Sequence, residues 1–502
     1  MRASRALAAL LAIASACATP GDRAPGLVVA LESEPQSLDP RFATDAAASR
    51  VADLVHLGLT RPRDDARRAP ALASSWVQPD PRTVVFHLRD GFRFPDGAPV
   101  TSADVRATYE AVLDPTLASP KRGALEMVEA VEAPDPRTVV LRLREPFPPL
   151  LDATGIGILP AARARAAGEV SEGAGPFRIV HSDPGERLVL APNPGWPEAR
   201  PRLDPLVLRI VPDPLVRALE LRRGGVSLSQ DLPEPELLDW LAADPGLRVR
   251  RRPGTSFAYL ALNLRDPRLA KRRVRRALAL ALDREALLAA VLGGAGRPAS
   301  GLLAPEHWAY APASLPGRNP ARARRLLDRA GFPDPDGPGP QPRLRLVYKT
   351  STVATRRRLA EAIQAQLAAV GIALDVRTQE WATLYADVRA GRFELAAMAW
   401  VGVTEPDLYF LTLHSTMTPP AGYNRGGYAN PVMDRLTMRA RREPDSAVRR
   451  RLYARVQRLA ARDLPVVPLW WEDRVVVHTA RLHGFEPTAS GDLRGLADAH
   501  LE

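Results

Sequence analysis

Two positions in the C-terminal half combine a residue type and a setting suited to holding a small polar solute. Trp400 ends an apolar run over residues 393–400 that predicts a strand. In open α/β sheets ligands bind beyond the carboxyl ends of strands, so Trp400 can stack on a ligand there, or else fill the end of the sheet. Arg425 lies in the glycine-rich segment NRGG, where its guanidinium could hold a carboxylate; an exposed loop arginine is the alternative.

Sequence motifs of covalent or metal-dependent catalysis do not occur. There is no G-x-S-x-G elbow, no H-E-x-x-H helix, no phosphate-binding G-x-x-x-x-G-K loop and no Cys/His spacing typical of zinc. The eight histidines are isolated in sequence, which favours surface or supporting roles over metal ligation. We therefore expect a binding protein rather than an enzyme, with no metal and no cofactor. Carboxylate-only active sites leave no motif, so an exported hydrolase of cell-wall or glycan substrates is the rival hypothesis.

The N-terminus has the build of an export signal. Arg2 and Arg5 precede an apolar stretch over residues 6–16, which is shorter than the roughly 20 residues that span a bilayer. Residues 13–17, IASAC, resemble a bacterial lipobox, in which the cysteine is lipidated and becomes the new N-terminus. We expect a signal peptide over 1–16, lipid attachment at Cys17 and a tether over 17–26. The alternative is an ordinary signal peptide that contains a cysteine.

The formal charge of +12 raises the question of whether the protein binds a nucleic acid or an anionic membrane. Arginine supplies almost all of the 69 basic residues, since lysine occurs only at Lys121, Lys271 and Lys349. These residues are scattered among 57 acids, and the densest basic stretch, residues 271–276, lies on a helix whose other face is apolar. A solvated helix face explains that stretch better than a nucleic-acid site, so no nucleic-acid partner is expected.

Local patterns predict an α/β protein with several helix caps. Between residues 344 and 400, apolar strand-like runs alternate with helical ones, as in a sheet with helices on its faces. Asp266 with Pro267, Asp283 and Asn319 with Pro320 predict helix starts, and Thr101 with Asp104 predicts a capping box for a helix to Leu113.

A duplicated segment indicates a small α+β subdomain. Residues 79–92 read PDPRTVVFHLRDGF and residues 134–147 read PDPRTVVLRLREPF. In each copy a Pro-Asp-Pro turn precedes a strand with alternating apolar residues. Two copies are too few for a repeat solenoid, so we expect two strand units of one sheet.

Five segments together resemble a known family. They are EPQSLDP (34–40), LRDGFRFPDGAPVTSADV (88–105), GAGPFRI (173–179), VRRALALALDRE (274–285) and NRGGYANPVMDRL (424–436). In this order they are similar to the extracellular solute-binding proteins of peptide and nickel ABC importers, the dipeptide- and oligopeptide-binding class. The resemblance covers essentially the whole mature chain.

The resemblance implies an α/β clamshell of two lobes, with an extra α+β subdomain inserted in the first lobe. Mapped onto this chain, the first lobe takes residues 27–63, 171–258 and 469–502, the subdomain takes 64–170, and the second lobe takes 259–468. Two strands would then cross between the lobes at 257–263 and 464–471, both apolar runs. Tyr259 and Asn263, four apart on the first crossing, would face the cleft together, and Trp471 ends the second.

In the peptide binders that this chain resembles, an aspartate shortly after the tryptophan of the Trp400 strand takes the ligand's α-amino group. Here the nearest match is Val403, and the segment is one residue short. Glu405 or Asp407 could replace that acid through a small loop shift, or the ligand could lack a free amine. Asp407 could instead cap a helix that begins at Leu408.

The sequence as a whole predicts a substrate-binding lipoprotein of an ABC importer. Short peptides or a related small solute would be its ligands, and its partners would be the permease and ATPase subunits. We expect a monomer, anchored in the membrane by its lipid and located in the periplasm or another extracytoplasmic space. A sensor or chaperone on the same fold is a further alternative.

Overall fold

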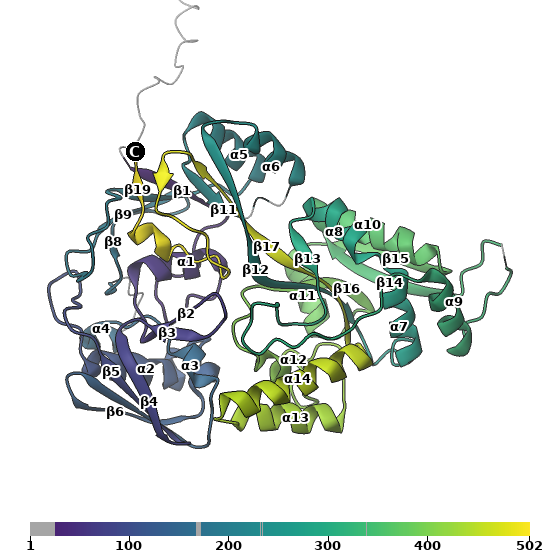
Figure 1. The fold of residues 1–502 in the computed structure, drawn as a ribbon, viewed down its shortest axis with the longest axis horizontal. Coiled ribbons are helices and arrows are strands. Elements are labelled where there is room, and N and C mark those ends of the chain that lie inside the picture. The colour runs from purple at the N-terminus through teal and green to yellow at the C-terminus, as the bar shows by residue number, and fades with distance from the viewer. Residues whose placement is uncertain (1–25, 167–171, 231, 233, 338) are drawn as a thin grey trace, which may run out of the picture.

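The chain folds into two α/β lobes, with a separate α+β subdomain beside the first lobe (Figure 1). The computed structural model describes residues 26–166, 172–230, 232, 234–337 and 339–502. This is the fold class predicted from the sequence. The expected residue boundaries of the lobes stay a prediction, so each lobe is identified below by its elements. The predicted signal peptide and Cys17 lie outside the described residues.

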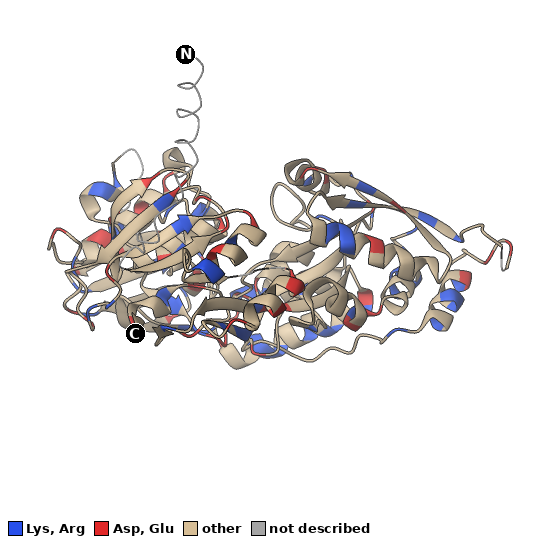
Figure 2. Ribbon diagram, turned by 90° about the horizontal axis from the view of Figure 1, so that it is seen from above, with Lys and Arg blue, Asp and Glu red and all other residues tan. Residues whose placement is uncertain are grey.

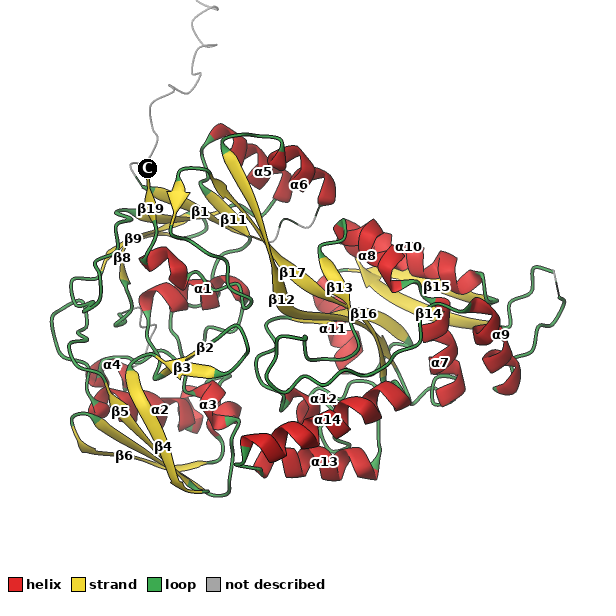
Figure 3. Ribbon diagram, in the orientation of Figure 1, coloured by secondary structure: helices red, strands yellow, loops and turns green. Residues whose placement is uncertain are grey.

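One sheet of 11 strands extends through both lobes in the order β15-β14-β16-β12-β17-β11-β1-β10-β9-β8, with β13 paired to β17. Strands β13 to β16 belong to lobe II, and β1 and β8 to β11 belong to lobe I (Figure 3). The strands are β1 (Leu27–Leu31), β8 (Phe177–Asp183), β9 (Arg187–Pro192), β10 (Leu206–Ile210), β11 (Leu228–Gln230), β12 (Leu247–Leu262), β13 (Gly296–Pro298), β14 (Leu344–Ser351), β15 (Ile372–Gln379), β16 (Leu395–Trp400) and β17 (Val466–Thr479).

The long strands β12 and β17 join the two halves of this sheet. They pair antiparallel, with Phe257 opposite Trp471 and Ala261 opposite Val466. Every residue of β12 from Gly254 to Leu262 is buried. A strand covered on both faces needs apolar residues at successive positions, which is why the sequence shows continuous apolar runs here.

Helices cover both faces of the lobe II sheet, as the alternating sequence pattern predicts. They are α7 (Arg272–Ala281), α8 (Arg284–Leu292), α9 (Pro320–Arg329), α10 (Ala354–Ala368), α11 (Trp381–Arg389), α12 (Leu408–Leu413), α13 (Pro431–Arg442) and α14 (Ser446–Asp463). The predicted caps Asp283 and Asn319 accept hydrogen bonds from Ala286 N at 3.0 Å and Arg322 N at 2.9 Å. Each bond satisfies a backbone donor that the first helical turn leaves free.

One predicted helix start is wrong. We expected a helix from Asp266 and Pro267, whereas α7 begins at Arg272. The Asp266 carboxylate accepts from Arg268 N at 2.8 Å and also binds the Arg268 guanidinium. The segment therefore forms turns before the helix starts, because Asp266 is held by its near neighbour.

Lobe I and the chain end surround the other half of the sheet. The helices are α1 (Ala46–Val55), α5 (Pro214–Arg223) and α6 (Pro235–Ala242), with a 3₁₀ turn at Arg494–Ala497. Short strand pairs are β2 (Thr60–Pro62) with β3 (Arg68–Pro70) and β18 (Leu482–His483) with β19 (His500–Leu501). Figure 1 shows the C-terminus returning to lobe I beside β1.

The duplicated segment builds the four-stranded sheet of the subdomain, in the order β4-β5-β7-β6. Its elements are β4 (Ala73–Asp80), β5 (Thr83–Leu88), β6 (Val128–Asp135), β7 (Thr138–Leu143), α2 (Ser102–Leu113), α3 (Leu150–Ala153) and α4 (Ala161–Ala164), with 3₁₀ turns at Pro115–Leu117 and Arg122–Leu125. Each copy supplies one turn and the strand after it. The two copies meet at β5 and β7, where Val84 faces Leu141 and Phe86 faces Val139.

Charged residues are mixed over the surface of both lobes. Figure 2 shows Lys and Arg interspersed with Asp and Glu rather than gathered on one face. The basic stretch on α7 is not wholly solvated, because Arg275 is buried with a relative exposure of 5%. No helix in the described part of the chain is long and apolar enough to cross a membrane.

Candidate ligand-binding site

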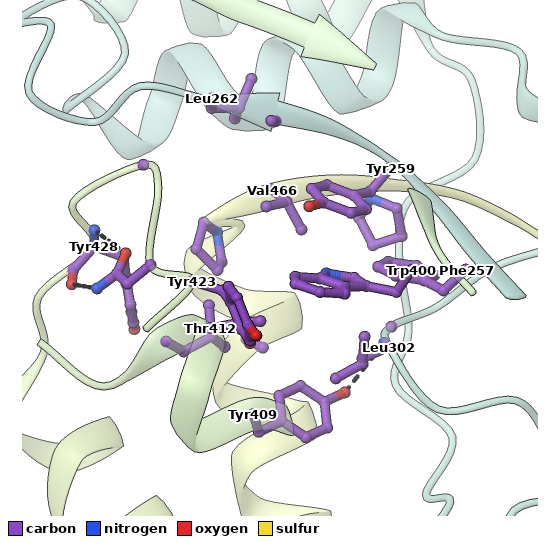
Figure 4. A pocket seen from close by; sticks show the side chains of 18 of the residues that line it. Phe257, Tyr259, Leu262, Leu302, Trp400, Tyr409, Thr412, Tyr423, Tyr428 and Val466 are labelled. Carbon is purple, nitrogen blue, oxygen red and sulfur yellow. Dashed lines mark hydrogen bonds between the residues drawn. The ribbon is translucent and has the colours of Figure 1, made fainter. Parts of the chain in front are cut away.

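A pocket lies in lobe II under the crossing strands. Phe257 and Tyr259 of β12, Trp400 at the end of β16 and Tyr409 of α12 contribute aromatic walls, and the loop at 423–428 closes another side (Figure 4). The Trp400 and Tyr423 rings lie 5.1 Å apart between centroids. The mostly apolar wall with few polar groups is typical of a small-molecule site.

Arg425 is the one cation among the described residues that line this pocket. Its side chain is buried, and its guanidinium carbon lies 4.9 Å from the centre of the Trp400 ring and 5.2 Å from that of Tyr385. It donates to the hydroxyl oxygens of Tyr259 at 3.3 Å and Tyr385 at 3.4 Å. Cation–π contacts and long bonds to neutral phenols are modest compensation for a buried charge.

The loop that carries Arg425 is held by its neighbour Asn424. The Asn424 amide donates to His414 O at 3.1 Å and Tyr428 O at 2.7 Å, and its oxygen accepts from Tyr428 N at 2.9 Å. Arg265 donates to Arg425 O at 3.0 Å. The backbone of Arg425 is therefore fixed on several sides, and the guanidinium is positioned before any ligand arrives.

Three of the seven predicted ligand residues meet at this pocket, namely Trp400, Tyr259 and Arg425. Asn263 does not join Tyr259 there, since its amide donates to Gly391 O at 2.9 Å and Phe393 O at 2.8 Å. Trp471 packs edge-on against Tyr310, with ring centres 6.0 Å apart, in the lobe II core. Both residues lie outside the pocket wall and serve the packing of the lobe.

Glu405 and Asp407, predicted as possible amine anchors, also lie outside the pocket wall. Glu405 forms an ion pair with Arg449, and Asp407 lies 3.4 Å from the guanidinium of Arg441. Burial raises the pKa of Glu405 to about 7 and that of Asp407 to about 6, while these arginines oppose both shifts. Asp407 precedes α12, but its side chain makes no capping hydrogen bond.

Arg441, the partner of Asp407, reaches toward the first half of the chain. Arg441 forms an ion pair with Glu126 at 3.2 Å, and its guanidinium lies over Phe147 of the subdomain at 4.9 Å. Thr404 donates to Asp152 at 3.2 Å, and Trp308 N donates to Asp65 O at 3.0 Å. The segment that follows Trp400 therefore forms a contact between lobe II and the subdomain side of the molecule.

His307 supports this contact as a neutral side chain, which makes protein stability depend on pH. Its Nδ1 accepts from Ala309 N at 3.0 Å, which leaves Nε2 to donate to Thr404 O at 3.2 Å. Burial lowers the pKa of His307 to about 4. Below pH 6.5 the unfolded chain gains a proton that the folded chain does not, so stability falls as the pH drops toward 4, by about 2 kcal/mol at pH 5.

We expect a His307→Asn variant, which keeps an acceptor for Ala309 N but cannot titrate, to lose this part of the pH dependence. Chemical unfolding at pH 7 and pH 5 measures the difference between the two proteins. Glu405 and Asp407 titrate in the wild type and in the variant alike. Their contribution to the pH dependence of stability, which is opposite in sign to that of His307, therefore cancels when the two proteins are compared. Equal pH slopes for the wild type and the variant would show that His307 is protonated in the folded state.

A second cavity lies between lobe I and the subdomain. Two ion pairs lie in its wall, where Arg89 binds Glu198 at 3.0 Å and Arg494 lies 3.9 Å from Asp53, and Lys121 there donates to Pro40 O at 2.8 Å. We take the lobe II pocket as the candidate ligand site because three of the predicted ligand residues meet there, and because Arg425 in its wall is buried without an ion pair among the described residues. The described part of the chain holds no group of three His, Cys, Asp or Glu residues that could bind a metal ion.

Sequence reasoning missed Tyr385, Tyr423 and Phe257. A signal existed for two of them: Phe257 lies two residues before Tyr259 on the expected strand, and Tyr423 lies two before Arg425. Tyr385 reaches Arg425 from α11, a contact between residues 40 apart that no local pattern indicates.

Comparison with known proteins agrees with this architecture. The model of "Bacterial extracellular solute-binding proteins, family 5 Middle" matches residues 68–421. Protein XP55 of Streptomyces lividans is 30% identical over 98% of this chain and 93% of its own length. The glutathione-binding protein GsiB of Salmonella typhi is 28% identical, with 95% of each chain covered.

The solved structure of DppA from Helicobacter pylori, an ABC transporter-associated periplasmic binding protein in complex with the peptide STSA, superposes with a TM-score of 0.79. It is 25% identical, over 95% of this chain and 98% of that one. The family match covers most of the chain and the fold match nearly all of it. The chain therefore belongs to the bacterial extracellular solute-binding proteins of family 5.

Proposed function

We propose that this protein is the substrate-binding lipoprotein of an ABC importer, and that it captures a short peptide or a related small solute. The lobes would close on the solute, and the closed form would deliver it to a membrane permease. The observation that carries the proposal is the preformed pocket where Trp400, Tyr259 and Arg425 meet. Relatives that bind glutathione or a peptide support the solute class. The described wall of this pocket includes no carboxylate, which disfavours the rival hydrolase.

Ligand binding is expected to stabilise the folded protein. A solute that binds only the folded chain adds about 2.7 kcal/mol at a hundredfold excess over its Kd, and closure reduces the radius of gyration. Thermal unfolding and X-ray scattering with a library of di- and tripeptides test this. A library that changes neither quantity would contradict peptide capture.

Lipid attachment is expected to depend on Cys17, the only cysteine of the chain. Cys17→Ser should release the protein from the membrane fraction and leave its thermal unfolding unchanged, because the described fold uses no thiol. Fractionation of cells that express each form measures the change. A Ser15→Thr variant is the matched control, since it keeps the cysteine. Membrane partitioning that persists in Cys17→Ser would contradict the anchor.

A further inference from the structure

We propose that the lobe II pocket selects solutes that carry a carboxylate and an apolar group but no free α-amino group, with Arg425 as the residue that reads the carboxylate. N-blocked amino acids and peptides have this chemistry. The inference rests on the proposed function and specifies its ligand.

The buried charge of Arg425 indicates an anionic ligand. Its relative exposure is 7%, and its Nε has no hydrogen-bond partner. Within the described residues it forms no ion pair, and its guanidinium contacts the Trp400, Tyr385 and Tyr423 rings. A buried guanidinium is costly without a counter-ion, and a ligand carboxylate supplies one with suitable donor geometry.

The phenols beside Arg425 can add to such a site. Arg425 donates to the hydroxyl oxygens of Tyr259 and Tyr385, so the hydrogen of each hydroxyl is directed elsewhere. Burial raises the pKa of Tyr259, which keeps its hydroxyl neutral and able to donate. A carboxylate next to the guanidinium can therefore receive charge-assisted and neutral hydrogen bonds together.

Glu405 and Asp407, the acids that could hold an α-amino group, already form ion pairs with arginines of this chain. Glu405 is bound by Arg449 and Asp407 is paired with Arg441. Val403, at the position nearest to the amine-binding aspartate of the peptide binders, is buried in the lobe II core and its N donates to Thr255 O at 3.2 Å. An ammonium group would enter a pocket whose described wall carries a cation and no carboxylate, which is unfavourable.

The rest of the pocket suits an apolar group. Leu302, Leu413, Val466 and Pro468 line it together with the aromatic rings. Moving an acyl or hydrocarbon group from water onto such a wall is favourable, because apolar surface of both ligand and protein is removed from water. The described part of the same wall offers a charged amine no carboxylate to pair with.

Matched ligands test both parts of the inference on the full-length protein. Leu-Leu, N-acetyl-Leu-Leu and N-acetyl-Leu-Leu amide are titrated by calorimetry into the wild type, Arg425→Gln and Arg389→Gln. Arg389 is the control because its guanidinium also lies over Tyr385, at 5.9 Å, but is exposed and does not line the pocket. The melting temperature of each ligand-free variant reports whether it folds.

We expect the acetylated acid to bind the wild type more tightly than the free dipeptide. Amidation should weaken binding at least tenfold in the wild type and in Arg389→Gln, and by less than twofold in Arg425→Gln. An amidation penalty that is the same in Arg425→Gln would overturn the carboxylate role of Arg425. Binding of the free dipeptide that is as tight as, or tighter than, that of the acetylated acid would overturn amine exclusion while leaving peptide capture intact. Absence of binding by all three ligands and the wider peptide library would overturn the proposed function and this inference together.

Discussion

Replacing Asp39 with alanine is expected to lower the free energy of unfolding by about 3–5 kcal/mol, because it leaves a buried arginine without its partner. Asp39 and Arg41 are both fully buried and form an ion pair, with Arg41 Nε 3.0 Å from Asp39 Oδ1. The Arg41 guanidinium also donates to Ala164 O at 2.8 Å. The backbone carbonyl of Arg41 accepts from the Ser119 hydroxyl at 2.7 Å. The pair thereby connects the start of lobe I to two segments of the subdomain.

An exposed ion pair whose partners are also two residues apart in sequence gives the control. Arg377 lies 2.8 Å from Asp375, and both side chains are more than half exposed. Asp375→Ala should change the stability by at most about 1 kcal/mol, because water replaces an exposed ion pair. Denaturant unfolding followed by tryptophan fluorescence compares the two variants. If both variants lost the same free energy of unfolding, burial would not be the reason why Asp39→Ala is destabilising.

A double replacement separates the unpaired charge from the lost contact. Asp39→Leu combined with Arg41→Met removes both charges, so it should recover much of the stability that Asp39→Ala loses. The same unfolding measurement applies. A double variant that is less stable than Asp39→Ala would show that the stability loss comes mainly from losing the ion pair, and not from leaving the Arg41 charge buried and unpaired.

Arg275→Met is expected to lower the free energy of unfolding by at least about 3 kcal/mol. The buried guanidinium donates to four backbone carbonyls: Asp463 O at 2.6 Å, Leu464 O at 2.9 Å, Leu269 O at 2.9 Å and Ala270 O at 2.8 Å. Two of these end α14 and two precede α7. Each buried carbonyl left unsatisfied costs about 1–3 kcal/mol, and methionine offers similar bulk without a donor.

Arg273→Met on the same helix is the matched control. Arg273 is exposed and makes one long bond, to Arg329 O at 3.4 Å. Its replacement should change stability by no more than about 0.5 kcal/mol. Thermal and denaturant unfolding of both variants give the comparison. A similar small loss in Arg275→Met would indicate that water reaches the four carbonyls.

Local patterns in the sequence determined most secondary structure and the family. The predicted caps Asp283 and Asn319 precede α8 and α9, and the predicted capping box of Thr101 and Asp104 begins α2. The alternating residues of the duplicated segment also form paired strands. These features depend on neighbours within a few residues, whose spacing can be read along the chain.

The roles of charged side chains were decided by tertiary structure. Glu405 and Asp407 looked equally suited to a ligand amine, but each pairs with an arginine more than 30 residues away in sequence. Arg275 lay within a stretch expected to face solvent, yet it binds the end of a helix 188 residues further on. Arg425 was a ligand candidate from its loop alone, but only the fold shows that it is buried against tyrosines of β12 and α11 and forms no ion pair with a described acid. The free energy of a charge depends on burial and on its partner, and both are set by which distant segments the fold brings together.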